Sequence, residues 1–273
     1  MHTSDAASKR IETQCVCARL LLALALICAG AAAGAKATDA QPARVEVQIG
    51  VCDEPQHIVR ALDLQRRGAP VETWLFDDAG MALFGRGLRL RLRLSERAAE
   101  LTLKAAIADC KSLSAEYLPA DLGKCEYDVH GSTVNSAVSL RRNLDTTMAR
   151  ALVAGNLALA EALSPAQVRY LDEALHVWPL PSGILPLGPI RTQSYRAAAA
   201  RADVDIARLP GGERFIDISR KVAYDQGRRA NAKPSRTLGS AGIAACADQS
   251  AQAVNKLRAL LRQPVATPPA RSP

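Results

Sequence analysis

The sequence predicts an α+β fold in which antiparallel strands dominate and helices flank the sheet. The first observation is the segment Leu88–Leu94, in which leucine and arginine alternate without exception. The second is a series of other alternating segments along the chain, several of which are joined by short turns. The third is an alanine-rich stretch from about Ser139 to His176, whose leucine spacing is typical of helices.

Residues 1–37 have the composition of a secretory signal peptide. Lys9, Arg10 and Arg19 precede an apolar run, Leu20–Cys28, and small residues then lead to an expected cleavage after Ala37. A single membrane anchor is the alternative, but the apolar run is short for a span. We therefore expect an exported protein, periplasmic or secreted from a bacterium, with no stable membrane span after cleavage.

Four cysteines remain after residue 37: Cys52, Cys110, Cys125 and Cys246. An even number in an exported protein predicts two disulfides, and three pairings are possible. We favour Cys110–Cys125, which closes a short loop between two strands, together with Cys52–Cys246, which ties the first strand to the C-terminal helix. A zinc site is not indicated, because these cysteines form no Cys-x-x-Cys pair.

The predicted elements follow the chain in a simple order. Strands are expected at Val45–Val51, Val71–Asp77, Leu88–Leu94, Leu101–Ala105, Lys124–His130, Ile190–Ala197, Val204–Arg208 and Arg214–Val222. Helices are expected at His57–Arg67, within Ser139–His176 with a capping box that begins at Ser164, and at Ala244–Arg262. We expect a loop over Lys111–Gly123 and a disordered tail over 263–273.

The arginine strand carries the main functional signal. Neighbouring residues of a strand point to opposite faces, so Arg89, Arg91 and Arg93 share the face opposite the leucines. A hairpin to the next strand would place Lys104 on the same cationic surface. Such a surface suits a polyanion, because guanidinium groups bind phosphate oxygens bidentately. The alternative is a solvated stripe whose arginines pair with carboxylates of neighbouring strands.

Two architectures satisfy this alternation. In the first, a half-buried antiparallel sheet exposes its charged face to solvent. In the second, the sheet curls into a barrel with a charged lumen and its apolar outer face lies under helices. Glu46, Glu126, Asp128 and Asp217 could then act as metal ligands, as acid/base groups or as counter-ions of the basic residues. Periodicity alone leaves both architectures open.

The order of these motifs resembles that of the CYTH domain, the triphosphate tunnel metalloenzyme superfamily. The matching segments are Val45–Val51, Thr73–Asp77, Gly87–Arg93, Leu101–Lys104, Cys125–Val129, Pro189–Thr192 and Phe215–Ser219. The resemblance implies an antiparallel eight-stranded tunnel over residues 38–262. It also implies that inward basic residues bind a triphosphate while inward carboxylates bind a divalent metal.

The resemblance assigns roles to particular residues. Phosphate binding falls to Arg91, Arg93, Lys104 and Arg191, with Arg89 added by the alternation of the strand. Glu46 and Asp217 match inward carboxylates, and with Glu126 and Asp128 they form the expected set of ligands for Mg²⁺ or Mn²⁺. No residue is assigned a catalytic role.

The chain also departs from the family pattern. Its first strand has Gln48 and Gly50 where the family has a carboxylate and a lysine, and Ser219 replaces a carboxylate of the last strand. Two hypotheses follow: a metal-dependent phosphohydrolase with an incomplete site, or a catalytically inactive tunnel with a binding or structural role in the cell envelope. The expected partner is a phosphorylated small molecule or polyphosphate. It is not nucleic acid, because the net charge of +8 is spread along the chain without interleaved aromatic residues.

Overall fold

The computed structural model describes residues 44–119, 122–130, 133–223, 238–249 and 252–262. The predicted signal peptide (1–37) and the predicted disordered tail (263–273) lie outside these residues. Among the described helices, none combines the length and the hydropathy needed to cross a membrane.

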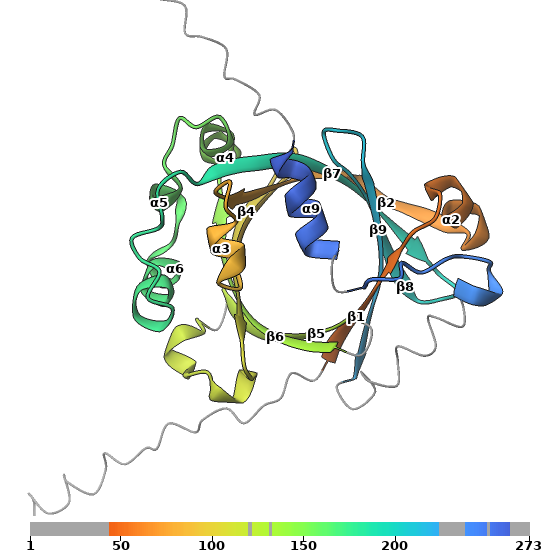
Figure 1. Ribbon diagram of the computed structural model, residues 1–273, viewed down its shortest axis with the longest axis horizontal. Coiled ribbons are helices and arrows are strands. Elements are labelled where there is room, and N and C mark those ends of the chain that lie inside the picture. The colour runs from red at the N-terminus through yellow and green to blue at the C-terminus, as the bar shows by residue number, and fades with distance from the viewer. Residues whose placement is uncertain (1–43, 120–121, 131–132, 224–237, 250–251, 263–273) are drawn as a thin grey trace, which may run out of the picture. The chain divides into compact units, whose positions relative to one another are not determined.

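The described strands close into one barrel with the order β1-β5-β6-β4-β3-β2-β7-β8-β9 (Figure 1). Their bounds are β1 Arg44–Val51, β2 Leu64–Asp77, β3 Leu88–Leu94, β4 Ala99–Ile107, β5 Gly123–His130, β6 Thr133–Leu144, β7 Leu185–Ala197, β8 Ala202–Arg208 and β9 Arg214–Ala223. Neighbouring strands are antiparallel except β1 and β5, which run parallel. The predicted barrel with a lumen is therefore confirmed. The prediction of eight strands, all antiparallel, is wrong in the number of strands and in the direction of the β1–β5 pair.

The additional strand is β6, whose second half lies in the stretch that the sequence predicts to be helical. Residues from Ser139 to Leu144 pair on one side with β4 and on the other with β5. The helices begin only afterwards, at α4 Thr146–Val153, α5 Leu159–Ala162 and α6 Pro165–Arg169. The predicted capping box between Ser164 and Gln167 is present at the start of α6.

Two other helix boundaries differ from the prediction. Helix α2 covers Pro55–Ala61 and ends before Asp63, whose positive φ of 46° breaks the helical path, so that β2 already begins at Leu64. The C-terminal helix α9 covers only Gln252–Leu261. Residues 244–246 instead hydrogen-bond to the end of β1. The loop expected over Lys111–Gly123 contains two short 3₁₀ turns.

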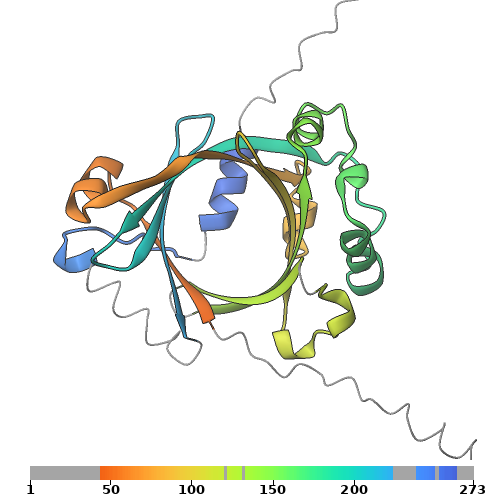
Figure 2. The same ribbon diagram turned by 180° about the vertical axis from the view of Figure 1, so that it is seen from behind.

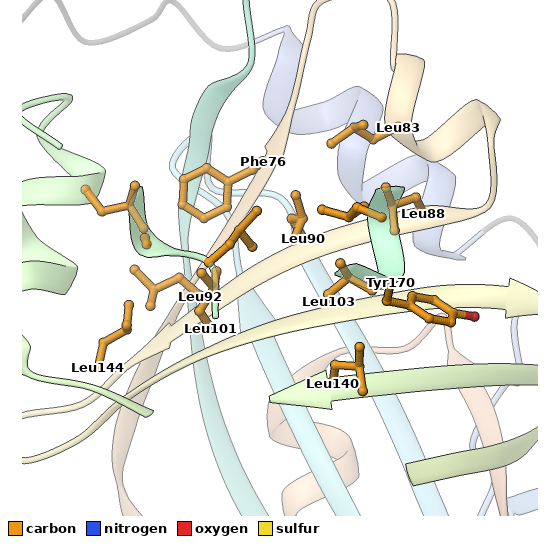
Figure 3. Close-up of a cluster of buried hydrophobic side chains, with 14 of the residues drawn as sticks. Phe76, Leu83, Leu88, Leu90, Leu92, Leu101, Leu103, Leu140, Leu144 and Tyr170 are labelled. Carbon is orange, nitrogen blue, oxygen red and sulfur yellow. The ribbon is translucent and has the colours of Figure 1, made fainter. Parts of the chain in front are cut away.

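The leucine face of β3 is the outer face of the barrel. Leu88, Leu90, Leu92 and Leu94 are buried together with Leu101 and Leu103 of β4, under side chains of the helical region such as Leu152 and Leu171. Figure 3 shows part of this cluster, with Leu90, Leu92 and Leu103 among the labelled side chains. Figure 1 shows α4, α5 and α6 outside this wall of the barrel. Burial of these leucines removes apolar surface from water and thereby fixes the arginine face toward the lumen.

Both disulfides have the favoured pairing. Cys52 is bonded to Cys246 and Cys110 to Cys125. The first joins the end of β1 to the segment before α9, and the second joins a 3₁₀ turn to β5. Two disulfides fit an oxidising compartment.

Candidate functional site

Three arginines form the centre of the site: Arg89, Arg91 and Arg93, here called the arginine ladder. In the pairing of β3 with β4, they lie opposite Lys104, Thr102 and Glu100 respectively. The intervening leucines are buried in the outer core, so the ladder and its partners on β4 face the lumen. The sequence prediction that Lys104 joins this surface is in agreement with the register.

Arg91 is the most deeply buried member of the ladder. Its Nε is inaccessible to water and has no hydrogen-bond partner among the described residues. Burial lowers the pKa of Arg91 to about 10, Arg93 adds to this effect, and Glu100 and Glu126 oppose it. The guanidinium is thus still protonated at neutral pH. A buried donor without an acceptor costs about 1–3 kcal/mol, and an anion's oxygen would remove that cost.

Arg89 is held from one side by an aromatic ring. Its guanidinium carbon lies 5.3 Å from the centroid of Phe84, a cation–π contact. Phe84 belongs to the short helix α3, Ala82–Gly85, whose backbone N–H groups at Leu83 and Phe84 donate to the buried carboxylate of Asp77 at 3.0 Å. Burial lowers the pKa of Arg89, and Asp128 partly opposes this. Asp77 and Phe84 were not recognised from the sequence.

Lys104 joins the ladder to two carboxylates of β5. Its Nζ lies 2.8 Å from Glu126 Oε1 and 2.5 Å from Asp128 Oδ2, while Lys124 Nζ lies 2.5 Å from Glu126 Oε2. Ser139 Oγ also donates to Glu126 at 3.0 Å. Burial alone would raise the pKa of Glu126, but Lys104 and Lys124 outweigh it and lower the pKa to about 2. In this arrangement Glu126 and Asp128 act as counter-ions of the lysines.

The opposite wall carries three aspartates on β8 and β9. Asp217 lies directly opposite Asp205 and binds Lys256 of α9. Asp205 accepts a hydrogen bond of 2.6 Å from Ser194, and Asp203 is 2.9 Å from both Arg67 and Arg196. The alternation Asp203-Val-Asp205 could have indicated this acidic face from sequence, whereas no pattern indicates that Lys256 reaches Asp217.

Two predicted site residues lie apart from the ladder. Arg191 Nε contacts Glu72 Oε1 at 3.2 Å, and its side chain is 69% exposed. In the β2–β7 pairing Arg191 lies opposite Glu72. The neighbours of Glu72 in β2 face the lumen, and adjacent residues of a strand point to opposite faces. The pair of Arg191 and Glu72 therefore lies on the outer face of the barrel. Glu46 lies opposite Asp128 of β5 and Lys221 of β9.

The predicted metal ligands do not fit a divalent metal as they are arranged here. In the described part of the chain, no three His, Cys, Asp or Glu side chains are grouped so that they could hold an ion. Glu126 and Asp128 bind Lys104, and Asp217 binds Lys256. Mg²⁺ and Mn²⁺ need free oxygen ligands, and ammonium groups take up these oxygens.

Comparison with known proteins identifies the architecture. No protein-family model and no curated protein matches the sequence. The fold matches HpAC1 of Hippeastrum, a proposed adenylyl cyclase with a dominant triphosphatase activity, with a TM-score of 0.51 and 15% identity over 78% of this chain and 95% of that one. The chain has a CYTH-like tunnel fold. A proposed adenylate cyclase of Bacillus halodurans is similar at a TM-score of 0.47 and 14% identity, over 77% of this chain and 98% of that one.

The resemblance to the CYTH domain that the sequence indicates is therefore confirmed for the fold. At this identity the likeness speaks for the fold alone, and the chemistry of the tunnel has to be argued from its own side chains. These side chains divide the lumen into a basic wall on β3 and β4 and an acidic wall on β8 and β9.

Proposed function

We propose that this chain binds the phosphate chain of a triphosphate- or polyphosphate-type anion through the arginine ladder. One observation carries the proposal. Five other basic side chains of the lumen each bind a carboxylate: Lys104, Lys124, Arg67, Arg196 and Lys256. By contrast, no ion pair within 4.0 Å joins Arg89, Arg91 or Arg93 to the described residues.

Unpaired arginines side by side repel each other and favour an anionic ligand that neutralises them. Alternate residues of a strand are about 7 Å apart, so the ladder extends over about 14 Å. This length suits an extended chain of phosphates better than a single phosphate group. The guanidinium forks supply bidentate donors along the chain, and the unpartnered Nε of Arg91 supplies another.

Hydrolysis of the bound anion is a second candidate function, favoured by the fold shared with HpAC1, which is described as having triphosphatase activity. The expected cofactor for this chemistry is Mg²⁺ or Mn²⁺. Because Glu126, Asp128 and Asp217 are bound to lysines, we expect anion binding to need no metal. A catalytically inactive binding tunnel, or a purely structural protein of the envelope, is the corresponding alternative.

The proposed location is the bacterial periplasm or the exterior. The composition of residues 1–37 supports export, and the two disulfides support an oxidising compartment. A phosphorylated small molecule or polyphosphate would then be the partner, rather than a cytoplasmic nucleotide or nucleic acid.

The test is calorimetric titration of residues 38–273 with tripolyphosphate in EDTA. We expect binding that weakens with salt and at least a tenfold loss of affinity in Arg91→Ala. Arg208→Ala, an exposed arginine of β8, is the matched control and should bind normally. Absence of binding by folded protein, or equal losses in both variants, would refute the proposal. Phosphate release measured with Mg²⁺, Mn²⁺ or EDTA then separates an enzyme from a binding protein.

A further inference from the structure

Helix α9 occupies part of the lumen. Its Leu257 and Leu260 are buried against Ile190, Ala207 and Phe215, which belong to β7, β8 and β9. Figures 1 and 2 show α9 within the ring of strands, unlike α4, α5 and α6. Lys256 of α9 also binds Asp217 on the acidic wall. The helix therefore covers a part of the tunnel that a ligand would otherwise reach.

The segment before α9 is fixed to the end of β1. Cys52 N–H donates to Ala244 O at 3.0 Å and Cys246 N–H donates to Gly50 O at 2.9 Å. The Gln249 side chain accepts from Gly50 N–H at 2.7 Å and donates to Gly50 O at 3.0 Å. The covalent part of this attachment is the Cys52–Cys246 disulfide.

The attachment point lies beside the carboxylate that α9 binds. Gly50 of β1 is the direct partner of Asp217 in the β1–β9 pairing. Lys256 follows Cys246 by only ten positions in the sequence. A short tether gives the helix a high effective concentration at its lumen site, and a cut tether lowers that concentration.

A reductant would approach this disulfide from the Cys52 side. Cys52 is exposed and Cys246 is buried, and both cysteines line a cavity of about 510 Å³ together with Asp53, Arg214 and Asn255 of α9. The sequence separation of the two cysteines is 194, so the bond constrains nearly the whole barrel domain in the unfolded state.

We propose that the Cys52–Cys246 disulfide keeps α9 in the lumen and that its reduction releases the helix and opens the anion site. A dithiol reductant would transfer two electrons and two protons: its own two thiols become a disulfide, and Cys52 and Cys246 become free thiols. Release of α9 is a property of the fold alone, whereas the effect on ligand access rests on the proposed function.

The experiment compares two matched double variants, C52S/C246S and C110S/C125S, each of which removes one disulfide. Hydrogen exchange of residues 252–261 and tryptic cleavage after Lys256 and Arg258 report on α9. In C52S/C246S we expect both rates to rise at least tenfold, and in C110S/C125S we expect wild-type rates. Wild-type protein treated with a dithiol under native conditions should behave as C52S/C246S does, which guards against a folding defect of the variant.

Access of the ligand to the lumen is measured in a separate experiment, as the association rate constant of tripolyphosphate in EDTA. We expect this association rate to rise at least threefold in C52S/C246S. We expect the same rise in Leu260→Asp, because this change weakens the packing of α9 while both disulfides stay intact. Unchanged exchange of α9 in both C52S/C246S and dithiol-treated wild type would overturn the proposal. Released α9 with an unchanged association rate would overturn its access part. If α9 is released but no variant binds tripolyphosphate, the release stands and the proposed function fails.

Discussion

The ammonium group of Lys256 binds the carboxylate of Asp217. This contact joins the C-terminal helix to the acidic wall at the position where Asp217 faces Asp205. Two carboxylates directly opposite each other on neighbouring strands repel, so the lysine neutralises a pair that the barrel alone leaves unfavourable.

We therefore expect Lys256→Ala to lower the free energy of unfolding by about 1 kcal/mol, because it removes a partly buried ion pair and leaves the two aspartates facing each other. Arg262→Ala, at the residue directly after α9, is the control. Its partner is Glu213, and both side chains are largely exposed, so we expect a loss below about 0.5 kcal/mol. Urea denaturation measures both values, and equal losses would contradict the assigned role of Lys256.

We predict that Arg91 lowers the free energy of unfolding of the ligand-free protein. Its Nε is buried without a partner, and Arg93 disfavours its charged form. Arg91→Met keeps a long side chain without the charge, and we expect it to raise the free energy of unfolding by about 1–2 kcal/mol. The same variant should lose affinity for tripolyphosphate. A clear loss of stability in the free protein would show that Arg91 has a structural role instead.

Glu126 should contribute to the pH dependence of stability. Lys104 and Lys124 lower its pKa to about 2, below its usual value of 4.5, in spite of burial. A carboxyl group whose pKa is lowered by folding contributes stability above its unfolded pKa, and this contribution is lost as the pH falls from about 4.5 through about 2.

The measurement is the free energy of unfolding of wild type and Glu126→Gln between pH 7 and pH 2. The variant should be less stable by up to about 3 kcal/mol at pH 7, and the difference should shrink over that acidic window. A difference that is independent of pH would mean that the charge of Glu126 contributes little.

The sequence was sufficient for the parts of the fold in which one pattern dominates. Strict alternation in Leu88–Leu94 defines both faces of β3, and burial of its leucines then places the arginines inside. Strand β6 was missed because its second half adjoins an alanine-rich helical stretch, and pairing with β4 and β5 decides its structure. The parallel pairing of β1 with β5 joins segments far apart in sequence, which hairpin spacing does not predict.

The candidate site, like the fold, could be predicted from the sequence only where one local pattern decides the structure. The ladder and Lys104 follow from alternation and hairpin register. The outward position of Arg191 depends on a bulge in the β2–β7 pairing, where the register shifts between Thr73 and Leu75. The partnership of Lys256 with Asp217 depends on where α9 docks, which is a matter of tertiary packing.

The central claim is that the arginine ladder binds a chain of phosphates, and the Nε–H group of Arg91 reports on it most directly. Its resonance in ¹H–¹⁵N spectra, assigned by its loss in Arg91→Lys, can be followed as tripolyphosphate is added in EDTA. We predict a downfield proton shift that saturates with binding, because the buried donor gains a phosphate acceptor. An unchanged Arg91 signal at saturating tripolyphosphate would contradict the account.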